Sequence, residues 1–221
     1  MGYGINLKAI SLPAYRDMLK TKELLPGRRL LLVGLDDAFD KLQAAGFDDA
    51  EALLKGIGAP KKLETVSQQT GIAPEYLILL KREMGGLQTK SVSLGDFPHL
   101  PPEVAAQLRE KGLKDSKDVY DATQGFAEPE RLCELAGISE THAREVCALC
   151  DLIRINGVGK VFAHILVDAG YRSARDIADE DAVHLRDNAN WISANPKYNL
   201  EPLGEKDAQY CIDYAALLLK E

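Results

Sequence analysis

One short turn has the residue types that can bind a phosphate group, and it reads Asn156-Gly157-Val158-Gly159-Lys160. The two glycines permit a tight backbone path, and Val158 between them can turn toward a core. The amide groups that open the following helix would then point outward. Exposed amides at a helix N-terminus, with the ammonium group of Lys160 beside them, attract an anion. Such a site would read the backbone of a nucleic acid and not its bases.

A second turn has a similar composition. Gly56 and Gly58 precede Lys61 and Lys62, and a helical pattern follows. The amides and the two lysines would suit a phosphate, so this turn is a possible secondary phosphate site. The alternative is an ordinary helix start, because Pro60 fits the first turn of any helix.

The overall charge limits what such turns can do. The chain has 221 residues, with 27 Lys and Arg against 34 Asp and Glu, which gives a net charge of −7. A surface of this sign repels polyanions unless its cations gather on one face, so a histone-like binder is excluded. A positive patch that joins Lys160, Arg154, Lys61 and Lys62 would favour nucleic acid as the partner. A negative or apolar surface there would favour a protein partner.

The cysteines raise the question of a zinc site, because Cys and His are the usual zinc ligands. The candidate ligands are Cys133, His142, Cys147 and Cys150. However, Cys147 and Cys150 continue an apolar helical pattern, and no turn residue separates them. We therefore expect small buried core residues, no bound metal and no cofactor.

No catalytic set emerges from the remaining polar residues. The histidines are scattered along the chain and have no nucleophile motif beside them. They are His99, His142, His164 and His184. The sequence therefore predicts a non-enzymatic protein, in which Trp191 packs the last helix against the preceding unit.

The elements that would position these residues form a repeated pattern. Three segments share a glycine that would end a helix, a capping side chain three residues later, and an apolar anchor four residues after the cap. The sets are Gly46, Asp49 and Leu53; Gly112, Asp115 and Val119; and Gly170, Ser173 and Ile177. Each segment is thus predicted to be a helix, a glycine turn and a capped helix.

The first two copies extend further in parallel. Gly71 follows Gly46 at the same spacing as Gly137 follows Gly112. We therefore expect residues 42–82 to superpose on residues 108–148. Strand signals are nearly absent, so the sequence predicts an all-α fold of tandem repeats of short helices. A loop-like interval near residue 90 predicts an N-terminal repeat unit at 1–90 and a continuous second body at 91–221.

The turn at 155–160 resembles the helix-hairpin-helix motif, and the whole chain resembles a bacterial family of unknown function made of tandem helix-hairpin-helix repeats. The segments that carry this resemblance are 69–72, 135–138, 151–159 and 168–171, and it is densest from about 125 to 221. The resemblance implies the all-α architecture. It brings no established activity, substrate or partner.

Two functional hypotheses remain open. The first is weak, sequence-independent binding of the nucleic-acid backbone through the turn at 155–160. The second is a protein-interaction scaffold that has lost phosphate binding. In both, the protein is cytoplasmic, because no export signal or apolar run of ~18 residues is visible and the cysteines are then reduced. The oligomeric state is open.

Overall fold

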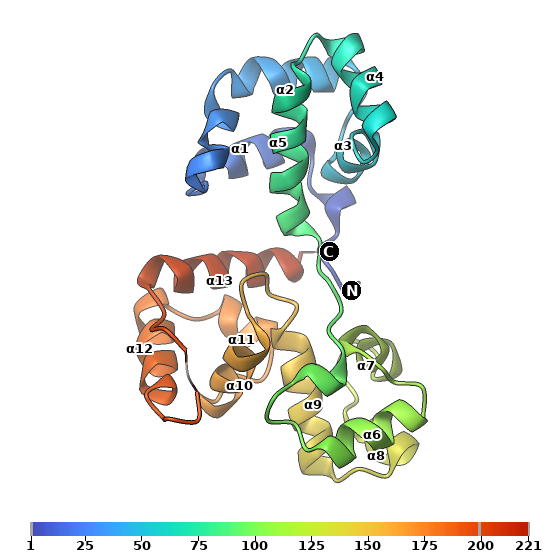
Figure 1. Ribbon diagram of the computed structural model, residues 1–221, viewed down its shortest axis with the longest axis vertical. Helices are drawn as coiled ribbons and strands as arrows, with labels where there is room; N and C mark the ends of the chain where they lie inside the picture. The colour runs from blue at the N-terminus through green and yellow to red at the C-terminus, as the bar shows by residue number, and fades with distance from the viewer. Residues whose placement is uncertain (1, 199, 221) are drawn as a thin grey trace. The chain divides into compact units, whose positions relative to one another are not determined.

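A computed structural model describes residues 2–198 and 200–220, and within this part of the chain the fold is all-α (Figure 1). The described residues form α-helices and short 3-10 helices and no strand. These residues also form two isolated β-bridges, Ser11–Asp49 and Ser93–Asp115.

The chain divides into two compact units. The N-terminal unit comprises residues 6–88, and the C-terminal unit comprises residues 89–220 together with residues 2–5. The sequence placed these first residues with the N-terminal half, and the contacts of Tyr3 explain the difference. Its hydroxyl lies 2.6 Å from that of Ser116, and its ring meets the ring of Tyr120 edge to face.

The N-terminal unit packs its helices around α5, which contacts α3, α4 and the 3-10 segment η2 (Figure 1). Its elements are η1 (Leu7–Ala9), α1 (Leu12–Thr21), η2 (Pro26–Leu32), α2 (Leu35–Ala44), α3 (Ala50–Gly56), α4 (Pro60–Thr70), α5 (Pro74–Met84) and η3 (Gly85–Leu87). Leu77, Leu80 and Met84 of α5 are fully buried. Glu83 is also buried, and Lys22 and Arg28 bind its carboxylate at 2.7 Å each.

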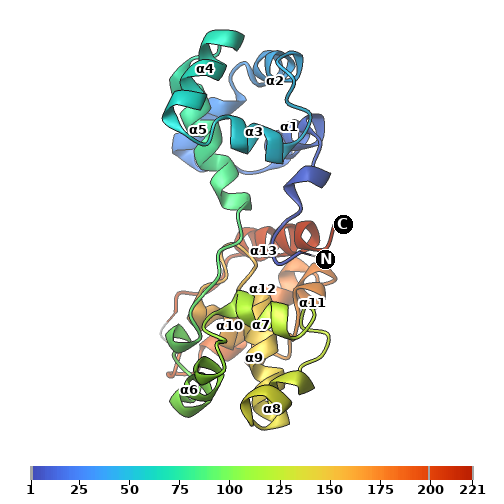
Figure 2. The same ribbon diagram turned by 90° about the vertical axis from the view of Figure 1, so that its right-hand side faces the viewer.

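The C-terminal unit is organised around α9, which contacts α7, α8 and α10, while α13 contacts α11 and α12 (Figure 2). Its elements are η4 (Leu94–Asp96), α6 (Pro102–Glu110), α7 (Ser116–Ala122), α8 (Glu130–Ala136), α9 (Glu140–Leu152), α10 (Lys160–Asp168), α11 (Ala174–Ala178), α12 (Ala182–Ser193) and α13 (Glu205–Leu218).

The predicted helix stops are confirmed one by one. The stop glycines have left-handed backbones, with φ of +89° at Gly46, +86° at Gly112 and +102° at Gly170. Each capping side chain accepts a hydrogen bond from a backbone amide three residues ahead; the caps are Asp49, Asp115 and Ser173. The apolar anchors are fully buried; they are Leu53, Val119 and Ile177.

A short backbone pairing supports each of the first two capped helices. At α3, the amide of Ala50 donates to the carbonyl of Ile10 at 2.9 Å. At α7, the amide of Ser116 donates to the carbonyl of Val92, also at 2.9 Å. At α11, a side chain takes this role, because the amide of Ala174 donates to the carboxylate of Asp151 at 3.0 Å.

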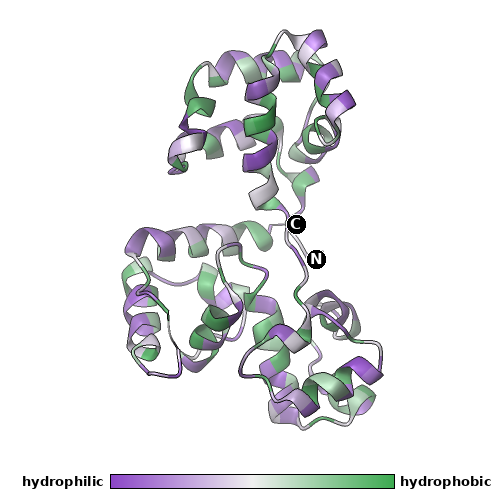
Figure 3. Ribbon diagram, in the orientation of Figure 1, coloured by the Kyte–Doolittle hydropathy of each residue, from purple (hydrophilic) through white to green (hydrophobic). Residues whose placement is uncertain are grey.

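Apolar side chains lie mainly inside each unit, but several are exposed, including a group between α1 and α2. In Figure 3 part of the ribbon between α1 and α2 is hydrophobic, although this segment runs along the outside of the N-terminal unit. None of the described helices is both long enough and apolar enough to span a bilayer.

Candidate phosphate-binding hairpin

The turn at 155–160 joins α9 to α10 and has the tight geometry that the sequence predicted. The amide of Val158 donates to the carbonyl of Ile155 at 3.0 Å, and both side chains are buried. Gly157 has a φ of +99°, a conformation that other residues rarely adopt. Gly159 is the N-cap of α10 and has no side chain to accept a bond from the first amides. The helix start therefore lacks a capping side chain.

The polar side chains of this turn contact other parts of the same unit. The ammonium group of Lys160 lies 2.7 Å from the carboxylate of Asp96 in η4. The side-chain amide of Asn156 donates to the hydroxyl of Tyr210 in α13 at 2.8 Å. Lys160 and Asp96 are both about half exposed, so their ion pair contributes only about 0–1 kcal/mol. Asp96 nevertheless places a negative charge beside the position that a phosphate would occupy.

Arg154 is not part of a positive surface patch, which corrects one expectation. Its side chain is 4% exposed, and it binds the carboxylate of Asp151 at 2.5 Å and the carbonyl of Tyr3 at 2.7 Å. The guanidinium group also lies 5.3 to 5.8 Å from the ring centroids of Tyr3, Tyr120 and Phe126. This cation stabilises the interior of the unit and is not accessible to a phosphate.

The glycines of the second candidate turn have a packing role. A Cβ atom at position 56 would lie 2.3 Å from the ring of Phe47, and one at position 58 would lie 3.0 Å from the carbonyl of Leu54. Close approach of neighbouring atoms thus gives both glycines a packing role that needs no ligand.

The lysines of this turn lie at the exposed start of α4. Lys61 is exposed, and the ammonium group of Lys62 lies 3.5 Å from the carbonyl of Lys55. Lys81 donates to the carbonyl of Gly58. This turn belongs to the N-terminal unit and the turn at 155–160 to the C-terminal unit, so each candidate site stands by itself.

The cysteine pair lies in the helix interior. Cys147 and Cys150 are buried in α9, as the sequence predicted, and burial raises the pKa of Cys147 to about 12. Because the thiolate is the form that binds zinc, such a thiol is a poor ligand. The described residues contain no group of three or more His, Cys, Asp or Glu side chains placed to hold a metal ion.

Trp191 was expected to pack inside, and the structure contradicts this. It lies on α12 with 82% of its surface exposed. Ile192 beside it, Asp168 and Tyr198 line a hollow of about 380 Å³ next to the indole ring. The sequence pattern gave no signal for this exposure, because it depends on which side of α12 packs on α10 and α13.

Sequence reasoning also missed an exposed apolar stretch in the N-terminal unit. Leu25, Leu30, Leu32 and Val33 are all exposed, Leu30 by 64% and Val33 by 72%. We call these four residues the apolar stretch. Buried Leu31 anchors it, because its carbonyl accepts a hydrogen bond from the hydroxyl of Tyr76 at 2.9 Å. The run of Leu and Val around two arginines was the available signal.

Comparison with known proteins places the chain in one family. The model of that family, described as a domain of unknown function (DUF4332), matches residues 98–217. The match covers more than half of the chain, so the chain belongs to this family. No curated protein and no solved structure matches it. The expected membership of a family of unknown function is confirmed, and the helix-hairpin-helix character of the repeats stays a prediction.

Proposed function

We propose that this member of the DUF4332 family is a non-catalytic protein-interaction module that acts in the cytoplasm. The apolar stretch of the N-terminal unit carries the proposal. Single exposed apolar side chains are common on protein surfaces, but a contiguous group of them marks an interaction site. Its cysteines are unpaired thiols, which persist in a reducing compartment.

Charges of both signs near the apolar stretch favour a protein over a lipid surface. Arg29 is exposed within the stretch, and the exposed carboxylates of Asp36 and Asp37 follow it at the start of α2. A protein partner can present both signs of charge around an apolar centre. An anionic membrane presents one sign and would repel the two aspartates.

Nucleic-acid binding through the turn at 155–160 is the competing hypothesis. It has one supporting observation, the uncapped start of α10 next to Lys160. The Lys160–Asp96 ion pair, the buried Arg154 and the net charge of −7 all weaken it. The protein-interaction hypothesis does not require an exposed cation at this turn.

A paired isolation experiment tests the proposal. The full-length protein and its Leu30→Ser/Val33→Ser variant are used to isolate partners from cells that express the chain. The control is Leu135→Ser, which changes an exposed apolar residue on α8 in the other unit. Any protein retained by the native chain and by the control is then purified and titrated against all three forms.

We expect the double substitution to weaken that binding at least about tenfold, since two exposed anchors of about 1 kcal/mol each are removed. Equal binding by all three forms would overturn the proposal. Binding of anionic vesicles that the double substitution abolishes would instead identify the stretch as a membrane contact. Binding of DNA that Lys160→Glu abolishes would favour the competing hypothesis.

A further inference from the structure

The hollow beside Trp191 has the chemistry of a cation-binding site. Its lining combines two aromatic rings, a carboxylate and one carboxamide with two aliphatic side chains; the residues are Asp168, Trp191, Ile192, Ala194, Asn195 and Tyr198. Aromatic faces attract cations through the ring quadrupole, and Trp does so most strongly.

The chain already holds one of its own cations at this place. The ammonium group of Lys197 lies 2.6 Å from Oδ2 of Asp168 and 4.5 Å from the ring centroid of Tyr198. The hydroxyl of Tyr198 donates to the same Oδ2 at 2.7 Å. Lys197 thus shows which kind of group the site accepts.

Three features leave room for another cation. Asp168 and Lys197 are both more than 40% exposed, so their ion pair is partly solvated and contributes at most about 1 kcal/mol. The indole ring of Trp191 stays almost fully exposed beside the pair. Both bonds to Asp168 use Oδ2 and neither uses Oδ1.

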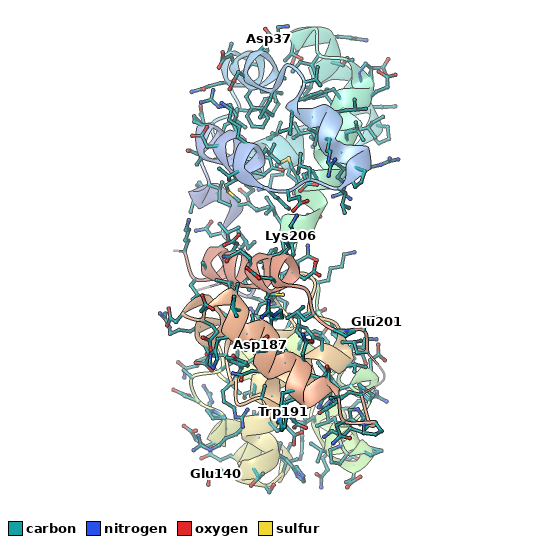
Figure 4. The ribbon with its side chains drawn as sticks, turned by 90° about the vertical axis from the view of Figure 1, so that its left-hand side faces the viewer. Asp37, Glu140, Asp187, Trp191, Glu201 and Lys206 are labelled. Carbon is teal, nitrogen blue, oxygen red and sulfur yellow. The ribbon has the colours of Figure 1, made fainter. Side chains whose placement is uncertain are left out.

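The charges nearby favour a cation over a phosphate. Burial alone would raise the pKa of Asp168, but the bonds from Lys197 and Tyr198 outweigh it and lower the pKa, so this carboxylate is ionised at neutral pH. In Figure 4, Asp187 lies on the same exposed side of α12 as Trp191, and Glu201 lies on the loop that follows. A nucleotide phosphate in the hollow would meet the carboxylate of Asp168, whereas Asp187 already pairs with Arg186.

We propose that this hollow is a recognition site for an arginine side chain of a partner protein, which displaces Lys197 from Asp168 and stacks on Trp191. A planar guanidinium group can pair with a carboxylate through two parallel bonds and lie flat on an indole ring, which an ammonium group cannot do. The site lies in the C-terminal unit, whereas the apolar stretch lies in the N-terminal unit. Failure at one surface therefore does not imply failure at the other.

The fluorescence of Trp191 provides a direct test, because it is the only tryptophan in the chain. The full-length protein is titrated with the peptide acetyl-Gly-Arg-Gly-amide. The matched probe replaces arginine with citrulline, which has the same shape and no charge, and adenosine monophosphate tests base stacking. We expect a saturable change with the arginine peptide and binding at least about tenfold weaker with citrulline.

Two substitutions decide whether the site is the one described. Lys197→Met removes the competing cation and should tighten binding of the arginine peptide about threefold. Asp168→Asn removes the charge and should weaken it about tenfold. Lys111→Met, an exposed lysine on the turn after α6, is the control and should change nothing.

The inference is overturned if the citrulline peptide binds as well as the arginine peptide, or if Lys197→Met leaves the affinity unchanged or weakens it. It is also overturned if adenosine monophosphate binds more tightly than the arginine peptide, because Trp191 would then be a base-stacking residue. Circular dichroism of Asp168→Asn shows whether that variant is folded, and Lys197→Met remains decisive if it is not.

Discussion

At the scale of single residues, Arg154 is the clearest case in which position in the fold decides the role. Its neighbours in the sequence make it look like a surface cation beside a phosphate-binding turn. Its partners Tyr3 and Tyr120 lie far away in the sequence, so no local pattern could show its burial. Once Arg154 is buried, Asp151 depends on it, because an ionised carboxylate in the interior needs a partner.

We predict that Arg154→Met lowers the free energy of unfolding by about 3–5 kcal/mol, because it leaves the carboxylate of Asp151 buried and unpaired. Urea unfolding followed by circular dichroism measures the change. The matched control is Arg175→Met, an exposed arginine on α11, which should change stability by less than about 0.5 kcal/mol. Similar small effects for both variants would show that Arg154 is a surface residue.

His164 gives the C-terminal unit a predicted dependence on pH. Burial, together with the neighbouring His99, lowers its pKa to about 4, and its Nε2 atom has no hydrogen-bond partner among the described residues. The unfolded chain takes up this proton near pH 6.5. The contribution that neutral, buried His164 makes to the stability of the folded unit is therefore fully present above about pH 6.5, and it is lost as the pH falls toward 4.

Lowering the pH from 7 to 5 should accordingly cost about 2 kcal/mol through His164 alone. Urea unfolding at both pH values, in the native chain and in His164→Gln, separates this contribution from those of other groups. The variant should lose less stability than the native chain over this interval. An equal loss in both would remove His164 as the cause.

At the scale of helices, the stops, caps and anchors could be predicted because each depends on residues close together in the sequence. Gly46 has a left-handed backbone, and Asp49 accepts a bond from an amide only three residues away. The exposure of Trp191 could not be predicted in this way. A helix sequence gives its apolar face, but the packing of α12 on α10 and α13 decides what remains uncovered.

We predict that Gly46→Ala destabilises the N-terminal unit by about 1–2 kcal/mol, because a residue with a Cβ atom resists a φ of +89°. A Cβ atom there would meet nothing within 4 Å, so backbone strain alone causes the loss. Gly85→Ala is the control in the same unit: its φ is −58° and the space around it is also open. Urea unfolding should show no loss for the control, and equal losses would refute the explanation.

The proposed tandem organisation makes a geometric prediction. Residues 42–82 should superpose on residues 108–148 in an experimental structure, with Gly46 on Gly112 and Gly71 on Gly137. All four glycines have φ between +69° and +89°, which favours this expectation. Matching glycines that fall on different turns after superposition would refute the duplication.

At the scale of the whole molecule, charge and exposed apolar surface favour a protein partner. The chain is acidic, the cation of its best phosphate-binding turn is paired with Asp96, and the apolar stretch exposes four large apolar side chains. The sequence left the two kinds of partner undecided, because it could not show that Lys160 meets a carboxylate far away in the chain.

Site-specific photo-crosslinking in cells tests this account most directly. A photoreactive amino acid replaces Val33 in the apolar stretch, Lys160 at the start of α10, or Glu64 on an exposed position of α4 as the control. We predict a discrete protein adduct from position 33 that Leu30→Ser reduces and that is absent from position 64. The account would be contradicted by a nuclease-sensitive adduct from position 160 together with identical protein adducts from positions 33 and 64. That result would identify a nucleic-acid-binding protein.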